Sequence, residues 1–220
     1  MKKKLVIFGT GQIAELADYY FTEDSDFEVV SFCLDAEYIG EEKQFKKRPI
    51  VAFEEVEKQY PPDDHWFFAA VSYTQLNAIR KEKFIDAKKK SYRIANYISS
   101  RATVLTDLGS CENCFILENN TIQPFSTIGK NVTLWSGNHI GHHSTIGDHC
   151  FVSSHVVISG NVQIGESCFL GVNSTLKEGI QIGPNNVLAA NAFIGKDTSE
   201  GGVYVGSPAK RIKSISEIDI

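Results

Sequence analysis

The sequence predicts an α/β domain with a parallel sheet, followed by a parallel β-helix. Between Lys4 and about Ser100, short apolar runs alternate with polar segments of helical length, a pattern typical of strands and helices that alternate along the chain. From Val104 onward, an aliphatic residue recurs at every sixth position, which is the unit length of one kind of β-helix. We therefore expect two domains, spanning residues 1–100 and 101–220.

The N-terminal domain is expected to be Rossmann-like, because its first strand ends in a glycine-rich turn that opens a helix. The turn, FGTGQIAE, has the spacing G-x-G-x-x-A from Gly9 to Ala14. A domain of about 95 residues leaves little room for the second half of a dinucleotide site, so NAD binding is the alternative rather than the expectation. The predicted strands lie within residues 5–9, 27–35, 65–72 and 92–98, and the predicted helices follow Gly11 and span residues 53–60 and 74–90.

The six-residue period covers sixteen positions, of which fifteen are aliphatic and one is Ser110. A glycine follows seven of these positions, as expected where a chain turns a tight corner. Three units that close a triangle form a coil of about 18 residues, so residues one coil apart stack and the aliphatic side chains fill the axis. The aliphatic positions are Val104, Ile116, Ile122, Ile128, Leu134, Ile140, Ile146, Val152, Ile158, Ile164, Leu170, Leu176, Ile182, Leu188 and Ile194.

The cysteines are expected to pack in the core rather than to form disulfides or bind zinc. The chain has five of them, and Cys114, Cys150 and Cys168 each lie two residues before an aliphatic position, where a small apolar side chain fits the interior. Cys111 and Cys114 form a CxxC, but a zinc ribbon needs a second one. Cys111 is expected at the start of the first coil.

Charge and hydropathy exclude several classes of function. The formal net charge is −5 over 220 residues, so the chain lacks the basic surface with which proteins bind nucleic acids. The apolar run after the N-terminal lysines ends at Phe8, which is too short for a secretory signal. Because later apolar runs are also too short to cross a bilayer, we expect a cytoplasmic protein without membrane insertion.

Four of the six histidines lie within the segment HIGHHSTIGDHC, from His139 to Cys150. The six-residue period places His143, His149 and His155 on successive corners of the triangle, where their side chains point in three directions. One chain is therefore not expected to gather its histidines around a metal ion.

Four segments of the chain carry a resemblance to a known family: LVIFGTGQIAELA, HHSTIGDHCFVS, GNVQIGESCFLGVNSTL and GVYVGSPAKRI. In them the chain resembles the bacterial nucleotide-sugar acetyltransferases, which include bacillosamine-type and perosamine-type N-acetyltransferases and the sialic acid O-acetyltransferase group. The resemblance implies a nucleotide-sugar domain followed by a left-handed hexapeptide β-helix. It also implies acetyl-CoA as co-substrate and a homotrimer with active sites at the subunit boundaries.

The resemblance further implies that His142 is a general base, which takes a proton from the acceptor as the acceptor attacks the thioester. A neutral imidazole suits this role because its ordinary pKa lies near neutral pH. Many relatives carry Glu or Asp at the next position, where this chain has His143. The carboxylate that orients the base must then come from elsewhere, with Asp148 and Glu118 as candidates, or be absent. His143 is a second candidate base.

The acceptor site is expected in the N-terminal domain. Backbone amides from Gly9 to Gln12 precede a helix, whose positive end favours an anion such as phosphate. A carboxylate that ends the second strand can bind a ribose or a base. The resemblance adds the end of the FFAAVS strand, with Arg80 on the following helix. The predicted substrate-binding residues are Gly9, Gly11, Gln12, Asp35, Ala70 and Ser72.

The donor site follows from the resemblance alone. Members of the family bind the pantetheine arm of CoA in the groove between adjacent β-helices. The matching residues here are Gly160, Val172 and Ala190, which would contribute mainly backbone groups. Lys210 and Arg211 follow Pro208 and are candidates for binding the phosphates of CoA.

Together these features predict an acetyl-CoA-dependent N-acetyltransferase that acts on a nucleotide-linked, UDP-type amino sugar for a surface glycan. One alternative is a sugar O-acetyltransferase of the sialic acid type. A second is a metal enzyme similar to the γ-class carbonic anhydrases, in which two neighbouring β-helices supply histidines to zinc. A third is a trimeric scaffold without catalysis.

Overall fold

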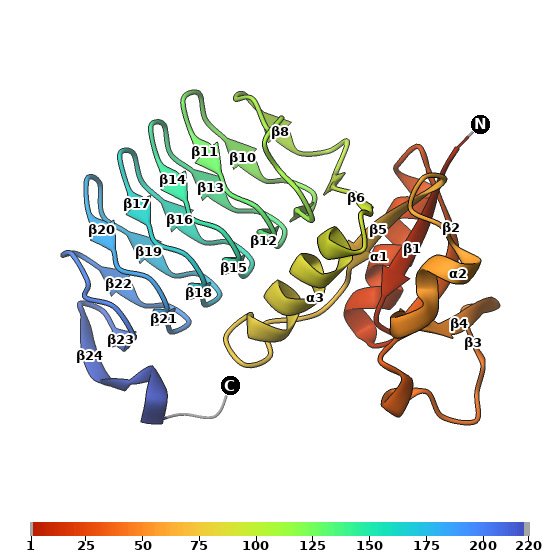
Figure 1. Ribbon diagram of the computed structural model, residues 1–220. Coiled ribbons are helices and arrows are strands. Elements are labelled where there is room, and N and C mark those ends of the chain that lie inside the picture. Colours follow the sequence, from red (N-terminus) through yellow and green to blue (C-terminus); the bar gives the residue numbers. More distant parts are fainter. Residues whose placement is uncertain (1, 218–220) are drawn as a thin grey trace. The chain divides into compact units, whose positions relative to one another are not determined.

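The computed structural model describes residues 2–217 and divides into two compact units (Figure 1). Met1 and residues 218–220, at the ends of the two predicted domains, lie outside the described residues. The segment Tyr73–Ala78 belongs to the second unit although α/β sequence surrounds it. We call the units the α/β unit, Met1–Ser72 with Ile79–Tyr97, and the β-helix unit, Tyr73–Ala78 with Ile98–Ile220.

The α/β unit contains a six-stranded sheet in the order β3-β4-β2-β1-β5-β6. All neighbouring strands are parallel except β3 and β4, which form an antiparallel pair. The central strand β1 is a continuous apolar run because both of its faces are covered, and Leu5, Val6 and Ile7 are fully buried. The strands are β1 (Lys3–Phe8), β2 (Phe27–Leu34), β3 (Gln44–Phe45), β4 (Arg48–Ala52), β5 (His65–Ala69) and β6 (Arg93–Ile94).

Helices pack on both faces of this sheet. Phe67 of β5 belongs to an apolar cluster that contains side chains of α2 and α3, whereas the next residue, Phe68, packs against Phe21 of α1 with ring centroids 5.0 Å apart. Alternate residues of a strand point to opposite faces, so α1 covers one face and α2 and α3 the other. The helical segments are α1 (Gln12–Glu23), η1 (Ala36–Tyr38), η2 (Phe53–Glu55), α2 (Val56–Gln59) and α3 (Ala78–Lys89).

Three local predictions for this half of the chain were wrong or incomplete. The hairpin of β3 and β4 was not predicted, because its apolar run is short and Pro49 interrupts it. The helix expected from Thr74 begins only at Ala78, since three preceding residues have left-handed φ angles of 51°, 48° and 69°. The strand expected over residues 92–98 divides into β6 and β7 (Tyr97–Ile98), which belong to different sheets.

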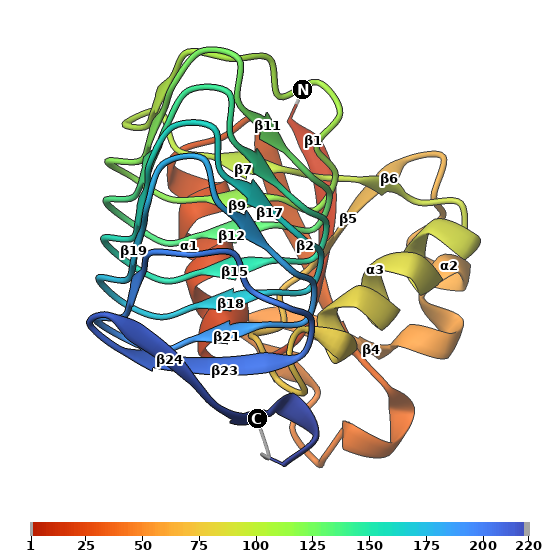
Figure 2. The same ribbon diagram turned by 90° about the vertical axis from the view of Figure 1, so that its left-hand side faces the viewer.

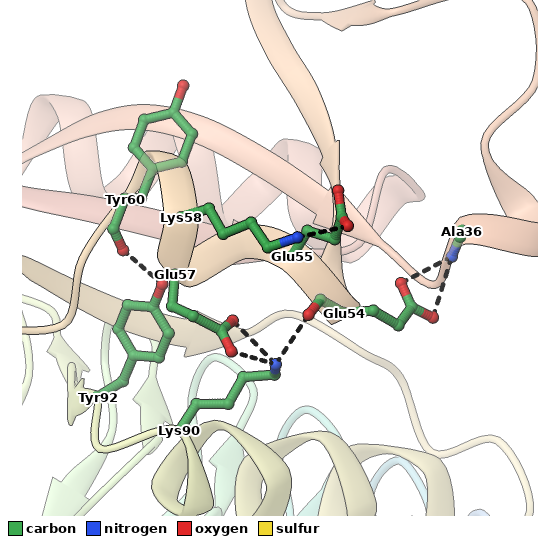
Figure 3. Close-up of polar contacts among 8 residues, drawn as sticks. All are labelled: Ala36, Glu54, Glu55, Glu57, Lys58, Tyr60, Lys90 and Tyr92. Atoms are coloured by element: carbon green, nitrogen blue, oxygen red, sulfur yellow. Dashed lines mark hydrogen bonds and ion pairs between the residues drawn. The ribbon is translucent and has the colours of Figure 1, made fainter.

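Polar contacts join α2 to the chain that follows α3 (Figure 3). Nζ of Lys90 lies 2.9 Å from both carboxylate oxygens of Glu57 and 3.3 Å from the carbonyl oxygen of Glu54. The Tyr92 hydroxyl donates to the carbonyl of Tyr60 at 2.5 Å. Partial burial opposes the ionisation of Glu57, but the hydrogen bond from Lys90 holds the pKa of Glu57 below its usual value. The contact therefore stabilises the fold at neutral pH, and its contribution is lost as pH falls through that pKa.

The β-helix unit winds through two-residue strands that form three sheets along its length (Figure 2). Strands 18 residues apart are parallel neighbours: Thr133 pairs with Phe151, and Phe151 with Phe169. The predicted coil length is confirmed by this register. The strands are β7 (Tyr97–Ile98), β8 (Thr103–Val104), β9 (Phe115–Ile116), β10 (Thr121–Ile122), β11 (Thr127–Ile128), β12 (Thr133–Leu134), β13 (His139–Ile140), β14 (Thr145–Ile146), β15 (Phe151–Val152), β16 (Val157–Ile158), β17 (Gln163–Ile164), β18 (Phe169–Leu170), β19 (Thr175–Leu176), β20 (Gln181–Ile182), β21 (Val187–Leu188) and β22 (Phe193–Ile194).

The axial positions form the core of this unit. From Ile116 to Ile194, every predicted aliphatic residue is at most 3% exposed, whereas Val104 at the first coil is partly buried. Ser110, the exception to the period, is exposed and lies in an irregular segment between β8 and β9. Cys114, Cys150 and Cys168 are buried free thiols within the same core, and Cys111 lies just before β9.

The corners require residues that tolerate a left-handed backbone. Non-glycine residues with φ near 60° recur at six-residue intervals, and asparagine adopts this conformation at a lower cost than other residues with a Cβ. Asparagine fills seven of these corners: Asn113, Asn119, Asn131, Asn161, Asn173, Asn185 and Asn191.

The C-terminal end of the unit is closed by the antiparallel pair β23 (Gly202–Gly206) and β24 (Ala209–Ser214), followed by η3 (Ile215–Glu217). β23 also continues the sheet that contains β21. Among the described residues, we find no helix with the length and apolar character needed to cross a bilayer.

If the axial residues carry the stability of the β-helix, Ile158→Ala lowers its free energy of unfolding by about 2–5 kcal/mol, because a buried aliphatic side chain leaves a cavity. Val157 on the same strand is 39% exposed, so Val157→Ala is the matched control and costs less than about 1 kcal/mol. Urea denaturation followed by circular dichroism measures both. Equal losses for the two variants would contradict this account of the core.

Candidate functional site

Three adjacent strands of the α/β unit end at one pocket. β2, β1 and β5 are parallel neighbours, and the strand order reverses at β1, the place at which such sheets bind ligands. The pocket has a volume of about 430 Å³, within the range of small-molecule sites. The structure brings all six predicted substrate-binding residues together here: Gly9, Gly11, Gln12, Asp35, Ala70 and Ser72 line it.

Gly9 shapes the floor of this pocket. Its φ is +116°, and a Cβ at this position would lie 2.8 Å from the carbonyl oxygen of Ala70, so only glycine fits. Its N–H donates to the carbonyl of Cys33 at 2.9 Å. The expectation that the Gly9 amide faces an anion was therefore wrong, because the neighbouring strand already uses that amide.

The beginning of α1 supplies the amides that remain. Gly11 is the N-cap of α1, and no side chain caps this helix end. The first amides of a helix have no carbonyl partner within the helix, and together with the helix dipole they favour an anion. Gly11 and Gln12 are exposed, and a Cβ at Gly11 would meet nothing within 4 Å. This end of the pocket is therefore open and suited to a phosphate.

The Asp35 carboxylate, which follows β2, is paired with a cation that sequence reasoning missed. Nζ of Lys83 in α3 lies 2.8 Å from Oδ1 of Asp35. Burial opposes the charge of Lys83, but hydrogen bonds to Asp35 and Glu82 keep the pKa of Lys83 above its usual value. The expected hydroxyl acceptor thus remains ionised beside a lysine. Arg80 is buried rather than on a surface, and it donates to the carbonyl of Ser72 at 3.1 Å.

His142 lies on an exposed corner of the β-helix. Its backbone N–H donates to Oε1 of Gln123 at 2.9 Å, which lies 19 residues earlier. The space in which a Gly160 side chain would lie is occupied by the His142 ring, because a Cβ at Gly160 would approach its Cε1 to 2.6 Å. The predicted stacking of these two positions is therefore observed. Gln123 was missed, although the 18-residue coil would have placed it near His142.

The two neighbouring histidine rings contact each other. Nδ1 of His142 lies 3.1 Å from Nδ1 of His143, and the His143 ring packs on Phe125 with centroids 4.8 Å apart. The two carboxylates considered as orienting groups bind elsewhere. Asp148 accepts from the backbone N–H of Lys130 at 2.8 Å, and Glu118 accepts from the Ser136 hydroxyl at 2.9 Å.

The remaining histidines of the β-helix unit lie apart from this corner. Nδ1 of the buried His149 lies 3.0 Å from Nδ2 of Asn131, which also bonds to Asn113, so this ring belongs to an internal polar ladder. His155 is exposed and packs over Gly137 on another corner. Within residues 2–217 of one chain, no group of three or more His, Cys, Asp or Glu side chains is arranged to hold a metal ion.

The predicted donor-site residues do not all meet within one chain. Gly160 lies on the corner of His142, whereas Val172 and Ala190 are exposed and stack, 18 residues apart, on the corner that follows β18 and β21. Lys210 lies farther along the β-helix, where it lines a pocket of about 520 Å³ with Lys196 and Tyr204. Arg211 is paired with the backbone and side chains near Ser199.

Comparisons with known proteins bear on this architecture. Residues 125–160 match the family described as bacterial transferase hexapeptide (six repeats), and residues 161–196 match the hexapeptide repeat of succinyl-transferase. Residues 125–196 are bacterial transferase hexapeptide repeats. His142, Gly160 and Val172 all lie within these hexapeptide repeats. Comparison with curated protein sequences gives no significant match.

Solved structures extend the likeness to nearly the whole chain. The acetyltransferase domain of PglB from Neisseria gonorrhoeae has a TM-score of 0.82 at 19% identity, over 96% of this chain and 100% of that one. PerB from Caulobacter crescentus, solved with CoA and GDP-perosamine, has a TM-score of 0.81 at 21% identity, over 96% and 97%. WeeI from Acinetobacter baumannii has a TM-score of 0.78 at 18% identity, over 94% and 99%. The predicted fold, an α/β domain followed by a left-handed hexapeptide β-helix, is confirmed.

Two glycines of the pocket have separable roles. We expect Gly9→Ala to lower the free energy of unfolding by about 2 kcal/mol or more, because a left-handed residue with a Cβ is strained and would overlap Ala70. Gly11→Ala changes stability by less than about 1 kcal/mol but weakens binding of a nucleoside diphosphate, since its methyl group occupies the space before the helix. Thermal unfolding and calorimetric titration with UDP measure the two effects. Equal destabilisation by both variants would contradict these roles.

Proposed function

We propose that this protein is an acetyl-CoA-dependent N-acetyltransferase whose substrate is an amino sugar linked to a nucleotide. One observation carries the proposal: an exposed histidine, His142, lies on the edge of a hexapeptide β-helix with its ring packed over a glycine of the next coil. An imidazole in this position is accessible to a substrate and can accept a proton near neutral pH. PerB, whose fold this chain shares, was solved with CoA and a nucleotide-linked amino sugar.

The α/β pocket supports a nucleotide acceptor. Its open helix end suits a diphosphate, and Asp35 suits a hydroxyl group of ribose or a donor group of a base. The wall is largely apolar, with Phe8, Leu34 and Tyr38 among the lining residues, as expected for a pocket that holds a planar base. We expect a UDP-linked sugar, made available in the cytoplasm and used for a surface glycan. GDP and dTDP sugars are the alternatives that a substrate panel distinguishes.

The donor site is proposed to form between two chains of a homotrimer. Because His142 with Gly160 and Val172 with Ala190 lie on different corners of one chain, they can border the same pantetheine arm only if adjacent chains supply them. Cyclic trimers place one corner of each chain beside a different corner of its neighbour. Lys210, in the pocket near the C-terminal end of the β-helix, would bind the CoA phosphates.

The proposed reaction is a direct transfer. His142 takes a proton from the acceptor amine as the nitrogen attacks the thioester carbonyl, and backbone amides stabilise the developing oxyanion. The carbon–sulfur bond then breaks, and the CoA thiolate recovers the proton from the imidazolium. The cysteines of the β-helix are buried in its core, which supports transfer without an acyl-cysteine intermediate.

A CoA-release assay on UDP-, GDP- and dTDP-linked amino sugars and on sialic acids tests this function. We expect turnover with an amino sugar nucleotide and a fall in kcat of roughly 10²- to 10⁴-fold in His142→Ala, the usual contribution of a general base. His149→Asn is the control, since this ring belongs to the internal ladder, and it should retain wild-type kcat.

The other outcomes of this assay are equally informative. Turnover of sialic acids alone would replace N-acetylation by O-acetylation of a sugar. Full activity of His142→Ala would contradict the assignment of the base. Absence of CoA binding would favour a scaffold, and stoichiometric zinc with carbonate dehydration would favour the metal enzyme.

Subunit complementation tests whether two chains share each site. We expect His142→Ala and Val172→Arg each to be inactive, the first because it lacks the base and the second because a long cation fills the groove. When the two variants are co-assembled in equal amounts, about a quarter of the sites combine an intact His142 with an intact Val172 from the neighbour. Recovery of activity to that extent supports the shared site, and a mixture without recovery contradicts it.

A further inference from the structure

The contact between His142 and His143 has a consequence for the proton on His142. The two Nδ1 atoms are 3.1 Å apart, which is a hydrogen-bond distance. A neutral imidazole carries one N–H and one acceptor nitrogen, so this contact is favourable only when a single hydrogen lies between the two atoms. One ring must donate, and the other must accept.

Both rings are held in place by neighbours on the same corner. His142 is fixed by Gln123, which accepts its backbone N–H, and by Gly160, over which its ring lies. His143 has a left-handed backbone with φ of 60°, its ring packs on Phe125, and its carbonyl accepts from Nε2 of Gln163 at 3.3 Å. The contact is therefore supported from both sides although both histidines are exposed.

The contact also decides which nitrogen of His142 is accessible. Within residues 2–217, Nδ1 of His142 bonds to His143, and no hydrogen bond engages its Nε2. No carboxylate of the described residues bonds to either ring. Only Nε2 is then open to an acceptor, and it is basic only if the ring proton is on Nδ1.

We propose that His143 is a positioning residue, whose Nδ1 accepts the Nδ1–H of His142 and thereby holds His142 in the tautomer with an unprotonated Nε2. This inference rests on the proposed function only for its catalytic consequence. When Nε2 takes the proton of the attacking amine, His142 becomes an imidazolium that still donates from Nδ1 to His143. The proton then leaves Nε2 for the CoA thiolate, so His143 neither gains nor loses a proton over the cycle.

A neutral acceptor differs from a carboxylate in this position. A carboxylate would fix the same tautomer and would also stabilise the imidazolium by its charge. An imidazole acceptor fixes the tautomer without a formal negative charge. The corner therefore orients the base mainly through geometry.

The chain itself supplies matched substitutions for a test. Phenylalanine already occupies the equivalent corner one coil earlier, at Phe125 with φ of 65°, so His143→Phe keeps a ring and an accepted backbone conformation but removes both nitrogens. Asparagine occupies seven other left-handed corners, and its Oδ1 can replace Nδ1 as an acceptor. His143→Asn therefore restores the function that His143→Phe removes.

The first measurement is the tautomeric state of His142, from nitrogen-15 NMR of the imidazole rings in the full-length protein without substrate. We expect Nδ1 protonated and Nε2 unprotonated in the wild type and in His143→Asn, and a mixture of tautomers in His143→Phe. A wild-type His142 protonated at Nε2 would overturn the proposal. Because no turnover is needed, this result stands whether or not the protein proves to be an acetyltransferase.

The second measurement is the kinetics of acetyl transfer. We expect kcat of His143→Phe to fall roughly 10- to 100-fold, a part of the ~10²- to 10⁴-fold that a general base supplies, with KM unchanged. His143→Asn should remain within about 3-fold of the wild type, as should the control His149→Asn at another corner. Wild-type kcat in His143→Phe would overturn the positioning role, whereas absence of transfer in the wild type would contradict the proposed function instead.

Discussion

The structure depends on one constraint, the requirement that every sixth side chain of the β-helix enters the axis. An aliphatic residue in this position is removed from water on all sides, and burial of apolar surface is the dominant favourable term in folding. The corners that connect these positions must reverse the chain within a few residues, which requires left-handed backbone conformations and favours asparagine. Two-residue strands are too short to be stable alone, so each coil depends on its neighbours.

The same constraint generates the histidine corner. Because each coil contains 18 residues, a residue is brought beside those one coil earlier and later rather than beside its distant neighbours in space. Gln123, His142 and Gly160 meet for this reason, and so do Phe125 and His143. The corner thus combines an exposed base with a rigid support. A site on a repeating scaffold gains its precision from the regularity of the repeat, and only the side chains at the corner distinguish it from the others.

The α/β unit solves a different problem. A parallel sheet aligns the ends of its strands, so the residues that follow β1, β2 and β5 converge even though they are far apart in the sequence. At this edge the helix end of α1 attracts an anion, and the pair of Asp35 and Lys83 offers polar groups beside it. Proposed acceptor and donor sites thus use two kinds of geometry, the edge of a sheet in one unit and the corners of a β-helix in the other.

The sequence by itself determined the repeat, the coil length, the axial core and the residues of the α/β pocket, because these follow from periodicity and from the ends of apolar runs. Tertiary structure alone decided the use of the Gly9 amide by Cys33, the pairing of Asp35 with Lys83 and the contact between the rings of His142 and His143. It also decided that the chain before α3 turns through three left-handed residues. Local patterns report how a segment is buried, whereas hydrogen-bond partners and ring contacts depend on which distant groups arrive at the same place.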